Sequence, residues 1–349
     1  MSAVRPIPPG FAPPGFAAAG PYAGAESPRS DGDPLVIGFV NNMPDAEFRA
    51  TEQQFARLLA AASLPGREVR LRLLALPEIP RAAAAAADIR ERYEDVGDLE
   101  GDTLDSLIVS GTEPRAPALT TEPYWPALAR LIDWAEDHTS STIWSCLAAH
   151  AAVLHLDGIE RQKFPAKLSG VFECARMGEH EIVDGMPSQW AIPHSRHNGL
   201  SEAALTARGY RILSGSPDTG PDMFVRPGRS LFLFLQGHPE YDRESLLREH
   251  RRDIGRFLAG RREHYPEAPG GYFDRHANER LAAFRQRAMR DRRPELLLDF
   301  PVASDGGLAQ CWREPALQLY GGWLRTLLAR REDRRGASAD RPRVLSEAH

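Results

Sequence analysis

Residues 141–158, "STIWSCLAAHAAVLHLDG", decide how the rest of the chain is interpreted. Residues 141–145 are typical of a short buried strand, and residues 147–156 have the small side chains of a helix that lies close against a sheet. Cys146 stands where the predicted strand ends and the helix begins. A helix N-terminus carries unpaired N–H groups and a partial positive charge, which favour a thiolate. Cys146 is therefore a candidate nucleophile, with a buried core thiol as the alternative.

Apolar segments rich in β-branched residues alternate with helical patterns before this stretch. Strands are predicted in residues 35–40, 68–76 and 104–111. Amphipathic helices are predicted in residues 45–62 and 122–138, the first with Phe48, Thr51, Phe55, Leu58 and Leu59 at helical spacing. This βαβ order predicts an α/β fold with a largely parallel sheet and helices on both of its faces.

The second half of the chain predicts a mixture of strands and helices. Hairpin-like strands are expected in residues 167–177, 209–217 and 222–228, followed by a buried strand in residues 230–236. A long helix follows in residues 241–260. Residues 272–328 have helical patterns, and we expect them to form a C-terminal helical elaboration of the same domain.

Composition sets limits on the class of protein. Of the 349 residues, 42% are hydrophobic and 26% are charged, which is typical of a globular protein. The formal net charge of -5 gives no overall field that would attract nucleic acid or anionic lipid. Three cysteines cannot form a disulfide framework, and no apolar stretch is long enough to span a membrane. These features predict a soluble cytoplasmic protein.

Three regions are expected along the chain. Residues 1–33 are rich in Pro, Gly and Ala and predict a disordered leader, whose prolines would break the apolar core of a signal peptide. Residues 34–330 are expected to form the folded domain. Residues 331–349 are charged and poor in apolar side chains, and they predict a solvated tail.

A second cluster of reactive groups is expected where the strand in residues 230–236 ends. The sequence "QGHPEYD" places His238 and Glu240 directly after this strand. In an open α/β sheet, ligands bind at the carboxyl ends of the strands, where Cys146 is also expected. His238 could take the thiol proton and Glu240 could orient the imidazole, as in a cysteine triad. The alternative is an ordinary Gly-His-Pro-Glu turn.

Other motifs give weaker signals. His194 and His197 in "PHSRH" resemble metal ligands, but no acidic or cysteine ligand nearby in the sequence completes a set, so no metal site is predicted. Glycine-rich phosphate motifs are absent. Lys167 and Ser195 are expected at or within loops. Arg252 lies in the helix after His238, either on a solvated basic face or as a clamp for a substrate carboxylate.

Taken in order, several short motifs resemble one family. They are "NNMPDAEFRATEQQF", "LIVSGTEP", "YWPALARLIDWAEDHTSSTIWSC", "KLSGVF", "PHSRH", "GHPEYD" and "REHRRD". The same order is found in the bacterial homoserine O-acyltransferases of the class I glutamine amidotransferase-like fold, which include O-succinyltransferases and O-acetyltransferases. The resemblance covers residues 35–260 with short gaps, and more weakly "LYGGWLRTLL" near the end.

The resemblance implies ping-pong acyl transfer from an acyl-CoA to L-homoserine in methionine biosynthesis. Cys146 would carry the acyl group, His238 would act as general base, and Glu240 would orient His238. The positions that match substrate contacts of the family are Lys167, Ser195 and Arg252, with Glu249 as a partner for the substrate ammonium. The thioester is already activated, so no metal or other cofactor is expected. A homodimer is the default expectation for the assembly.

The sequence departs from the family pattern at four places. Leu147 and His150 stand where the family has a tryptophan and a glutamine. The helix after "NNMP" begins with Asp45-Ala46-Glu47, where the family usually has a lysine. Arg115 stands where the family has glycine or glutamate. In the family, glycine accompanies succinyl transfer and glutamate accompanies acetyl transfer. Arg115 would attract the free carboxylate of a succinyl group, so its charge favours succinyl-CoA as donor.

Several alternatives remain open at this point. The donor could be acetyl-CoA, and the acceptor could be serine or another hydroxy amino acid. A glutamine amidotransferase-like hydrolase would share the Cys and His-Pro-Glu arrangement, but glycines normally flank its cysteine. A non-catalytic binding protein on the same scaffold is the remaining class. Rapid alkylation of Cys146 by iodoacetamide would separate an activated thiol from a core thiol.

Overall fold

The computed structural model describes residues 16–18, 33–99, 104–301 and 307–339, so most of the predicted leader and residues 340–349 lie outside it. The strands are β1 (Phe16–Ala18), β2 (Leu35–Val40), β3 (Val69–Ala75), β4 (Glu94–Asp95), β5 (Ser106–Val109), β6 (Ser141–Ser145), β7 (Gln162–Arg176), β8 (Gln189–Gly199), β9 (Arg211–Ser216), β10 (Gly220–Arg226) and β11 (Leu231–Leu235). The α-helices are α1 (Phe48–Ala61), α2 (Ala83–Arg92), α3 (Trp125–His138), α4 (Leu147–Asp157), α5 (Glu202–Ala207), α6 (Ser245–Leu258), α7 (Arg275–Arg290) and α8 (Arg313–Ala339). Short 3-10 helices are η1 (Val96–Leu99), η2 (Leu119–Thr121), η3 (Glu181–Val183) and η4 (Pro294–Asp299).

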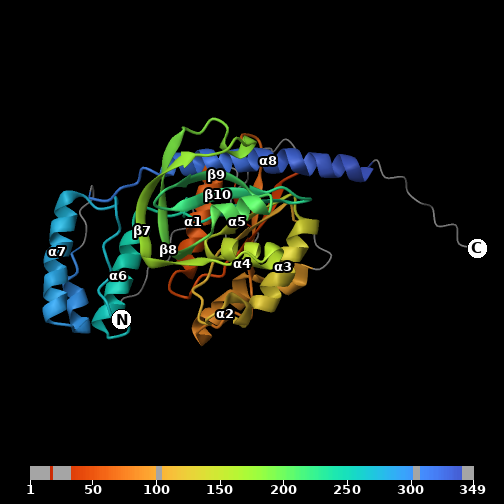
Figure 1. Cartoon of the computed structure of the whole chain (residues 1–349). Coiled ribbons are helices and arrows are strands. Elements are labelled where there is room, and N and C mark those ends of the chain that lie inside the picture. The colour runs from red at the N-terminus through yellow and green to blue at the C-terminus, as the bar shows by residue number, and fades with distance from the viewer. Residues whose placement is uncertain (1–15, 19–32, 100–103, 302–306, 340–349) are drawn as a thin grey trace, which may run out of the picture.

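One mixed sheet runs through the centre of the described structure (Figure 1). Its strand order is β1-β3-β2-β5-β6-β11-β10-β9-β7-β8, with β4 paired to β3. The strands from β1 through β3, β2, β5 and β6 to β11 pair in parallel. The strands β11, β10, β9, β7 and β8 pair antiparallel. The α/β prediction with a largely parallel sheet is confirmed.

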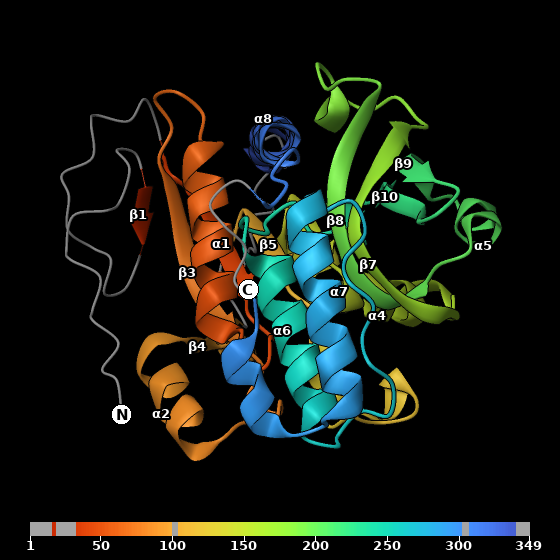
Figure 2. The ribbon, with the colours of Figure 1, turned by 90° about the vertical axis from the view of Figure 1, so that its left-hand side faces the viewer.

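Helices cover both faces of this sheet (Figures 1 and 2). Successive strand residues point to opposite faces, so Ile143 of β6 belongs to one apolar core and Trp144 to the other. Helices α1 and α8 pack on the Ile143 face, where Phe55 and Trp323 are fully buried. Helices α3 and α4 pack on the Trp144 face. Within the described residues, no helix is both long and apolar enough to cross a membrane.

The carboxyl ends of three neighbouring parallel strands meet at one edge of the sheet. Strand β6 pairs with β5 on one side and with β11 on the other. Gly111, Cys146 and His238 follow these three strands within three residues of their ends. Helix α6 comes next in the chain and packs with α7 and η4 around a third apolar cluster, which is part of the predicted C-terminal elaboration (Figure 2).

Strands β7 and β8 correct one expectation. The strand predicted in residues 167–177 is confirmed as part of β7, which begins earlier, at Gln162, and forms a long antiparallel hairpin with β8. Ser195 was expected at or within a loop, but it lies in β8. Most residues of β7 are exposed or half-buried. A strand of this kind lacks the buried apolar run that marks a strand in sequence, and its polar residues are typical of a loop.

Helix α8 corrects the predicted end of the folded domain. The helix continues past residue 330 to Ala339, so residues 331–339 of the predicted tail are helical. Arg331 is only 6% exposed, and its Nε lies 3.0 Å from Oδ1 of Asp105. Its Nη1 also donates to the carbonyl oxygen of Pro34 at 3.0 Å. The charged composition predicted that this segment would be a solvated tail, but these buried contacts hold the helix against the start of the domain.

Replacing Trp323 by alanine tests how much α8 contributes to stability. Trp323→Ala removes a fully buried indole and its hydrogen bond to Oγ of Ser141 at 3.0 Å. We expect the free energy of unfolding, measured by chemical denaturation, to fall by about 3–5 kcal/mol. Arg325→Ala, at an exposed position of the same helix, should change it by less than about 0.5 kcal/mol. Equal losses in the two variants would contradict this packing.

Candidate active site

Cys146 occupies a strained turn between β6 and α4. Its backbone has φ of 52° and ψ of -113°, and no other non-glycine residue in the described ranges has positive φ. Such a conformation costs on the order of 1–3 kcal/mol and persists only where the surroundings impose it. The amide of Cys146 donates to the carbonyl oxygen of Leu235 in β11 at 2.7 Å. The neighbouring strand and the start of α4 therefore hold the thiol at the sheet edge.

Gly111 brings the end of β5 against the start of α4. A Cβ atom added at Gly111 would lie 2.9 Å from the amide nitrogen of Leu147, which is closer than any side chain allows. Leu147 is the first residue of α4, so its N–H has no acceptor within the helix. A free amide beside the thiol, at the positive end of a helix, can stabilise an oxyanion that forms next to Cys146.

His238 and Glu240 lie together at the end of β11. Nδ1 of His238 is 2.8 Å from Oε1 of Glu240, and both side chains are buried. The imidazole stacks on the ring of Tyr241 with centroids 4.2 Å apart. Burial disfavours the imidazolium, but the Glu240 carboxylate and then Cys146 outweigh it and hold the pKa of His238 well above its usual value. Cys146, His238 and Glu240 line the same cavity, so the structure brings the three residues together.

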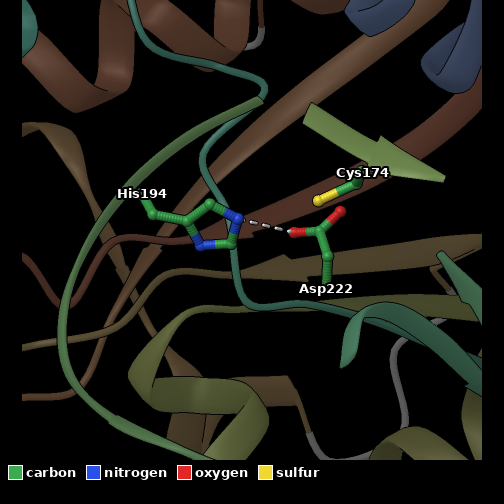
Figure 3. A group of neighbouring side chains, drawn as sticks. All are labelled: Cys174, His194 and Asp222. Atoms are coloured by element: carbon green, nitrogen blue, oxygen red, sulfur yellow. Dashed lines mark ion pairs between the residues drawn. The ribbon is translucent and has the colours of Figure 1, made fainter. Parts of the chain in front are cut away.

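Figure 3 shows a second buried group of side chains, which does not line the cavity. Cys174, His194 and Asp222 place their ligand-type atoms within 4.8 Å of one another. The expectation that no acidic or cysteine group accompanies His194 is therefore wrong, because β7 and β10 supply both from distant sequence. Burial raises the pKa of Cys174 to about 12, with a further contribution from Asp222, so its sulfur is a thiol.

The hydrogen bonds of this group point to a structural role. Asp222 accepts from the amide of Gly237 at 3.1 Å and from Oγ of Ser214 at 3.0 Å, and its Oδ1 is 3.3 Å from Nε2 of His194. The other ring nitrogen of His194 accepts from Nε of Arg196 at 3.2 Å. Because Gly237 immediately precedes His238, Asp222 fixes the backbone that presents the imidazole.

The predicted substrate-binding residues come together on the α6 side of the site. Nζ of Lys167 lies 3.3 Å from Oε2 of Glu249 and 3.1 Å from Oδ2 of Asp253. Oγ of Ser195 also donates to Glu249. Burial would raise the pKa of Glu249, but Lys167 and the hydrogen bond from Ser195 hold it below its usual value. A charged carboxylate thus stands among cations at this wall.

Arg252 completes this wall, together with three residues that sequence reasoning missed. Its Nη1 lies 3.0 Å from Oε1 of Glu47, and its Nε is 3.5 Å from Oδ1 of Asp253. The hydroxyl of Tyr241 donates to Glu249 at 2.5 Å. Asp253 and Tyr241 lie in the quoted motifs, directly after Arg252 and Glu240. Glu47 stands at one of the departures from the family pattern. These positions in the sequence could have identified the three residues. The contact between Glu47 and Arg252, however, forms only because the start of α1 lies next to α6.

A cavity of about 350 Å³ joins these groups. Its lining includes the predicted residues Cys146, His238, Glu240, Lys167, Ser195, Glu249 and Arg252. Arg115 is not part of this lining. Its side chain is exposed and borders a neighbouring hollow of about 360 Å³, while its amide donates to Oε1 of Glu122. Residues 111–114 of the loop after β5 line the cavity, but the structure does not place the next residue, Arg115, in its lining.

His150 explains one departure from the family pattern. Its Nε2 lies 2.8 Å from Oε1 of Gln236, next to the strand end that presents His238. Burial lowers the pKa of His150 to about 3, so the ring is neutral. A neutral imidazole provides a hydrogen-bond donor at this place, as the amide of a glutamine would.

The fold and the site together define a class. The strained cysteine between a parallel strand and a helix and the His–Glu pair after the adjacent strand place three reactive side chains at one edge of an α/β sheet, as covalent catalysis by a cysteine requires. A family model described as homoserine O-succinyltransferase matches residues 22–333. The chain belongs to the homoserine O-succinyltransferase family and is an O-acyltransferase.

Known relatives cover most of the chain. It is 50% identical to a homoserine O-succinyltransferase of Rhodopseudomonas palustris, over 84% of this chain and 88% of the relative. It is 48% identical to one of Methylorubrum extorquens, over 83% and 86% of the two chains. Among solved structures, it is similar to a glutamine amidotransferase from Methylobacillus flagellatus, with 15% identity, a TM-score of 0.48 and coverage of 84% and 94%.

A substitution at Gly111 tests the close approach of β5 to α4. We expect Gly111→Ala to lower kcat about 100-fold, because the methyl group must push the start of α4 away from the thiol. Acyl transfer is measured by steady-state kinetics, with folding followed by circular dichroism. Gly97→Ala is the control, since its Cβ would approach only the Asp95 side chain, at 3.2 Å. Normal turnover by Gly111→Ala would show that the contact is not needed.

A substitution at Glu240 tests the charge on His238. In Glu240→Gln the imidazolium loses its main counter-charge while burial still opposes it, so the pKa of His238 should fall. The pKa is measured by NMR titration of the imidazole, and kcat should fall about 100-fold. Glu244→Gln, at an exposed position of the same segment, should leave both unchanged. An unaltered His238 titration in Glu240→Gln would contradict the pairing.

Proposed function

We propose that the protein transfers the succinyl group of succinyl-CoA to the hydroxyl of L-homoserine through a thioester on Cys146. The observation that carries the proposal is the strained turn at Cys146, together with the His238–Glu240 pair, in which Nδ1 lies 2.8 Å from Oε1. Membership of the homoserine O-succinyltransferase family and the names of the relatives support the reaction and the donor. An acetyl donor or a serine acceptor would use the same nucleophile.

The first half-reaction moves the acyl group onto the protein. The thiolate of Cys146 attacks the thioester carbon, and the carbonyl oxygen becomes an oxyanion that the amide of Leu147 can stabilise. The tetrahedral intermediate then breaks its bond to the CoA sulfur. The imidazolium of His238 gives its proton to the leaving thiolate, so that free CoA and an acyl-cysteine result. Glu240 stabilises the imidazolium before that step.

The second half-reaction moves the acyl group to the acceptor. Neutral His238 takes the proton of the homoserine hydroxyl as its oxygen attacks the acyl carbon. The bond from this carbon to the sulfur of Cys146 then breaks. The products are O-succinylhomoserine and the thiolate–imidazolium pair, ready for another cycle. Both substrates carry the atoms that the reaction needs, so we propose that no metal or other cofactor takes part.

The wall formed by α6 and β7 fits the zwitterionic end of homoserine. Lys167 and Arg252 offer cations for the α-carboxylate, and Glu249 offers an anion for the ammonium. In the described structure these groups pair with one another. An amino acid that enters can exchange these pairs for its own charges, so the site is balanced in charge with and without it. Ser195 helps to orient Glu249 through their hydrogen bond.

We further propose that the protein acts in the cytoplasm, in the biosynthesis of methionine. The three cysteines are free in the structure, which fits a reducing compartment. Acylation of the homoserine hydroxyl converts it into a carboxylate leaving group, which prepares the side chain for later substitution by sulfur.

The covalent intermediate is tested by intact-mass measurement after brief mixing of the full chain with succinyl-CoA. We expect one succinyl increment on the wild type, none on Cys146→Ala, and discharge of the increment when homoserine is added. Cys311→Ala removes the exposed cysteine and is the matched control, which should acylate like the wild type. An increment that persists in Cys146→Ala would overturn the nucleophile, and no discharge by homoserine would overturn the acceptor.

A further inference from the structure

The basic side chains that line the cavity differ in their partners. Lys167 and Arg252 contact the carboxylates of α6, as described above. Arg256 forms a bidentate pair with Glu113, with both N–O distances 2.9 Å. Arg262 lies 3.6 Å from a carboxylate oxygen of Asp253. These four cations are already balanced by acidic groups of the protein.

Arg196 is engaged in a different way. Its side chain is 4% exposed, and Nη1 donates to the carbonyl oxygen of Asn198 at 2.7 Å. Nη2 donates to the carbonyl oxygen of Thr219, and Nε donates to His194. All three nitrogens of its guanidinium are therefore used inside the protein, so Arg196 is not available to a ligand.

Arg161 is the exception among the cavity cations. It is half-buried, lies between α4 and β7, and lines the cavity. Within the described ranges of the chain, its guanidinium has neither a hydrogen bond nor an ion pair. Burial lowers the pKa of Arg161, with partial compensation by Tyr124 and Glu122. A partly desolvated cation without a partner gains most from an anion that enters the cavity.

Tyr124 supplies a second unpartnered group close to Arg161. Its side chain is 3% exposed, and its hydroxyl has no hydrogen-bond partner among the described residues. Burial, followed by the charge of Glu122, raises its pKa above the usual value, so the phenol is a neutral donor. Oε1 of Glu122 accepts the amides of Arg115 and Ala116, at 2.5 and 2.6 Å, and the carboxylate forms no ion pair with Arg161 in the described structure.

The position of Arg161 relative to Cys146 indicates which part of the substrates it can bind. Arg161 acts electrostatically on His150, which lies one turn after Cys146 on α4. The charged groups proposed for homoserine come instead from α6 and β7. An acyl chain on Cys146 can therefore extend toward Arg161 and leave the α6 wall to the amino acid. Tyr124 borders the neighbouring hollow and not this cavity, so it is the guanidinium fork of Arg161 that matches a carboxylate here.

We propose that Arg161 binds the free carboxylate of the succinyl group and so selects a dicarboxylic acyl donor over acetyl. This inference rests on the proposed function and deepens it. It transfers to Arg161 the role that the sequence suggested for Arg115, whose side chain is exposed at the neighbouring hollow. An acetyl group has no charge that could pair with Arg161, so its transfer does not depend on Arg161.

The test compares Arg161→Gln with the wild type for the acylation of Cys146 by succinyl-CoA and by acetyl-CoA, followed by intact mass over time. We expect kcat/KM for succinyl-CoA to fall about 10- to 100-fold, with less than about a threefold change for acetyl-CoA. Arg208→Gln, an exposed arginine after α5, is the matched control and should leave both rates unchanged. Retained acetyl transfer shows that each variant is folded.

Different results separate the possible failures. Equal losses with both donors would show that Arg161 binds the CoA portion, and unchanged rates with both would show that it binds neither; each overturns the inference alone. Loss of succinyl preference in Arg115→Gln with no loss in Arg161→Gln would return the role to Arg115. If neither donor acylates Cys146 in the wild type, the proposed function fails, and this inference fails with it.

Discussion

The strained turn at Cys146 is the constraint on which the site depends. A positive φ at a residue with a Cβ atom is unfavourable by itself, so β5, β6, β11 and the start of α4 must impose it together. Gly111 permits the closest of these contacts, because only a residue without a side chain fits against the backbone of Leu147. In return, the thiol projects from the sheet edge beside a helix N-terminus and within reach of His238.

The base is held by a layer of buried polar groups. Asp222 binds the amide of Gly237 and faces His194, which in turn is bonded to Arg196. The hydrogen bond from Gly237 to Asp222 fixes the backbone before His238. The imidazole can then meet both Glu240 and Cys146. The cluster in Figure 3 therefore helps to position His238, although none of its three residues lines the cavity.

Charge is distributed unevenly around the cavity. The α6 wall carries cations and carboxylates that neutralise one another, which suits a zwitterion with one charge of each sign. Arg161 lines the same cavity and forms no ion pair with any described residue. A balanced wall and an unbalanced cation suit two different parts of the reaction, the amino acid acceptor and the acyl group. This asymmetry is a property of the folded chain, since Arg161 and Lys167 are only six residues apart in the sequence.

The sequence by itself determined the parallel half of the sheet, the turn at Cys146 and the pairing of His238 with Glu240, because local periodicity and short motifs report strand ends directly. The tertiary structure decided the rest. It extended the predicted strand at residues 167–177 back to Gln162, placed Ser195 in a strand, folded residues 331–339 into α8, and left Arg115 outside the lining of the cavity. It also left Arg161 without an ion pair among the described residues. These outcomes depend on contacts between residues far apart in the chain, which no local pattern records.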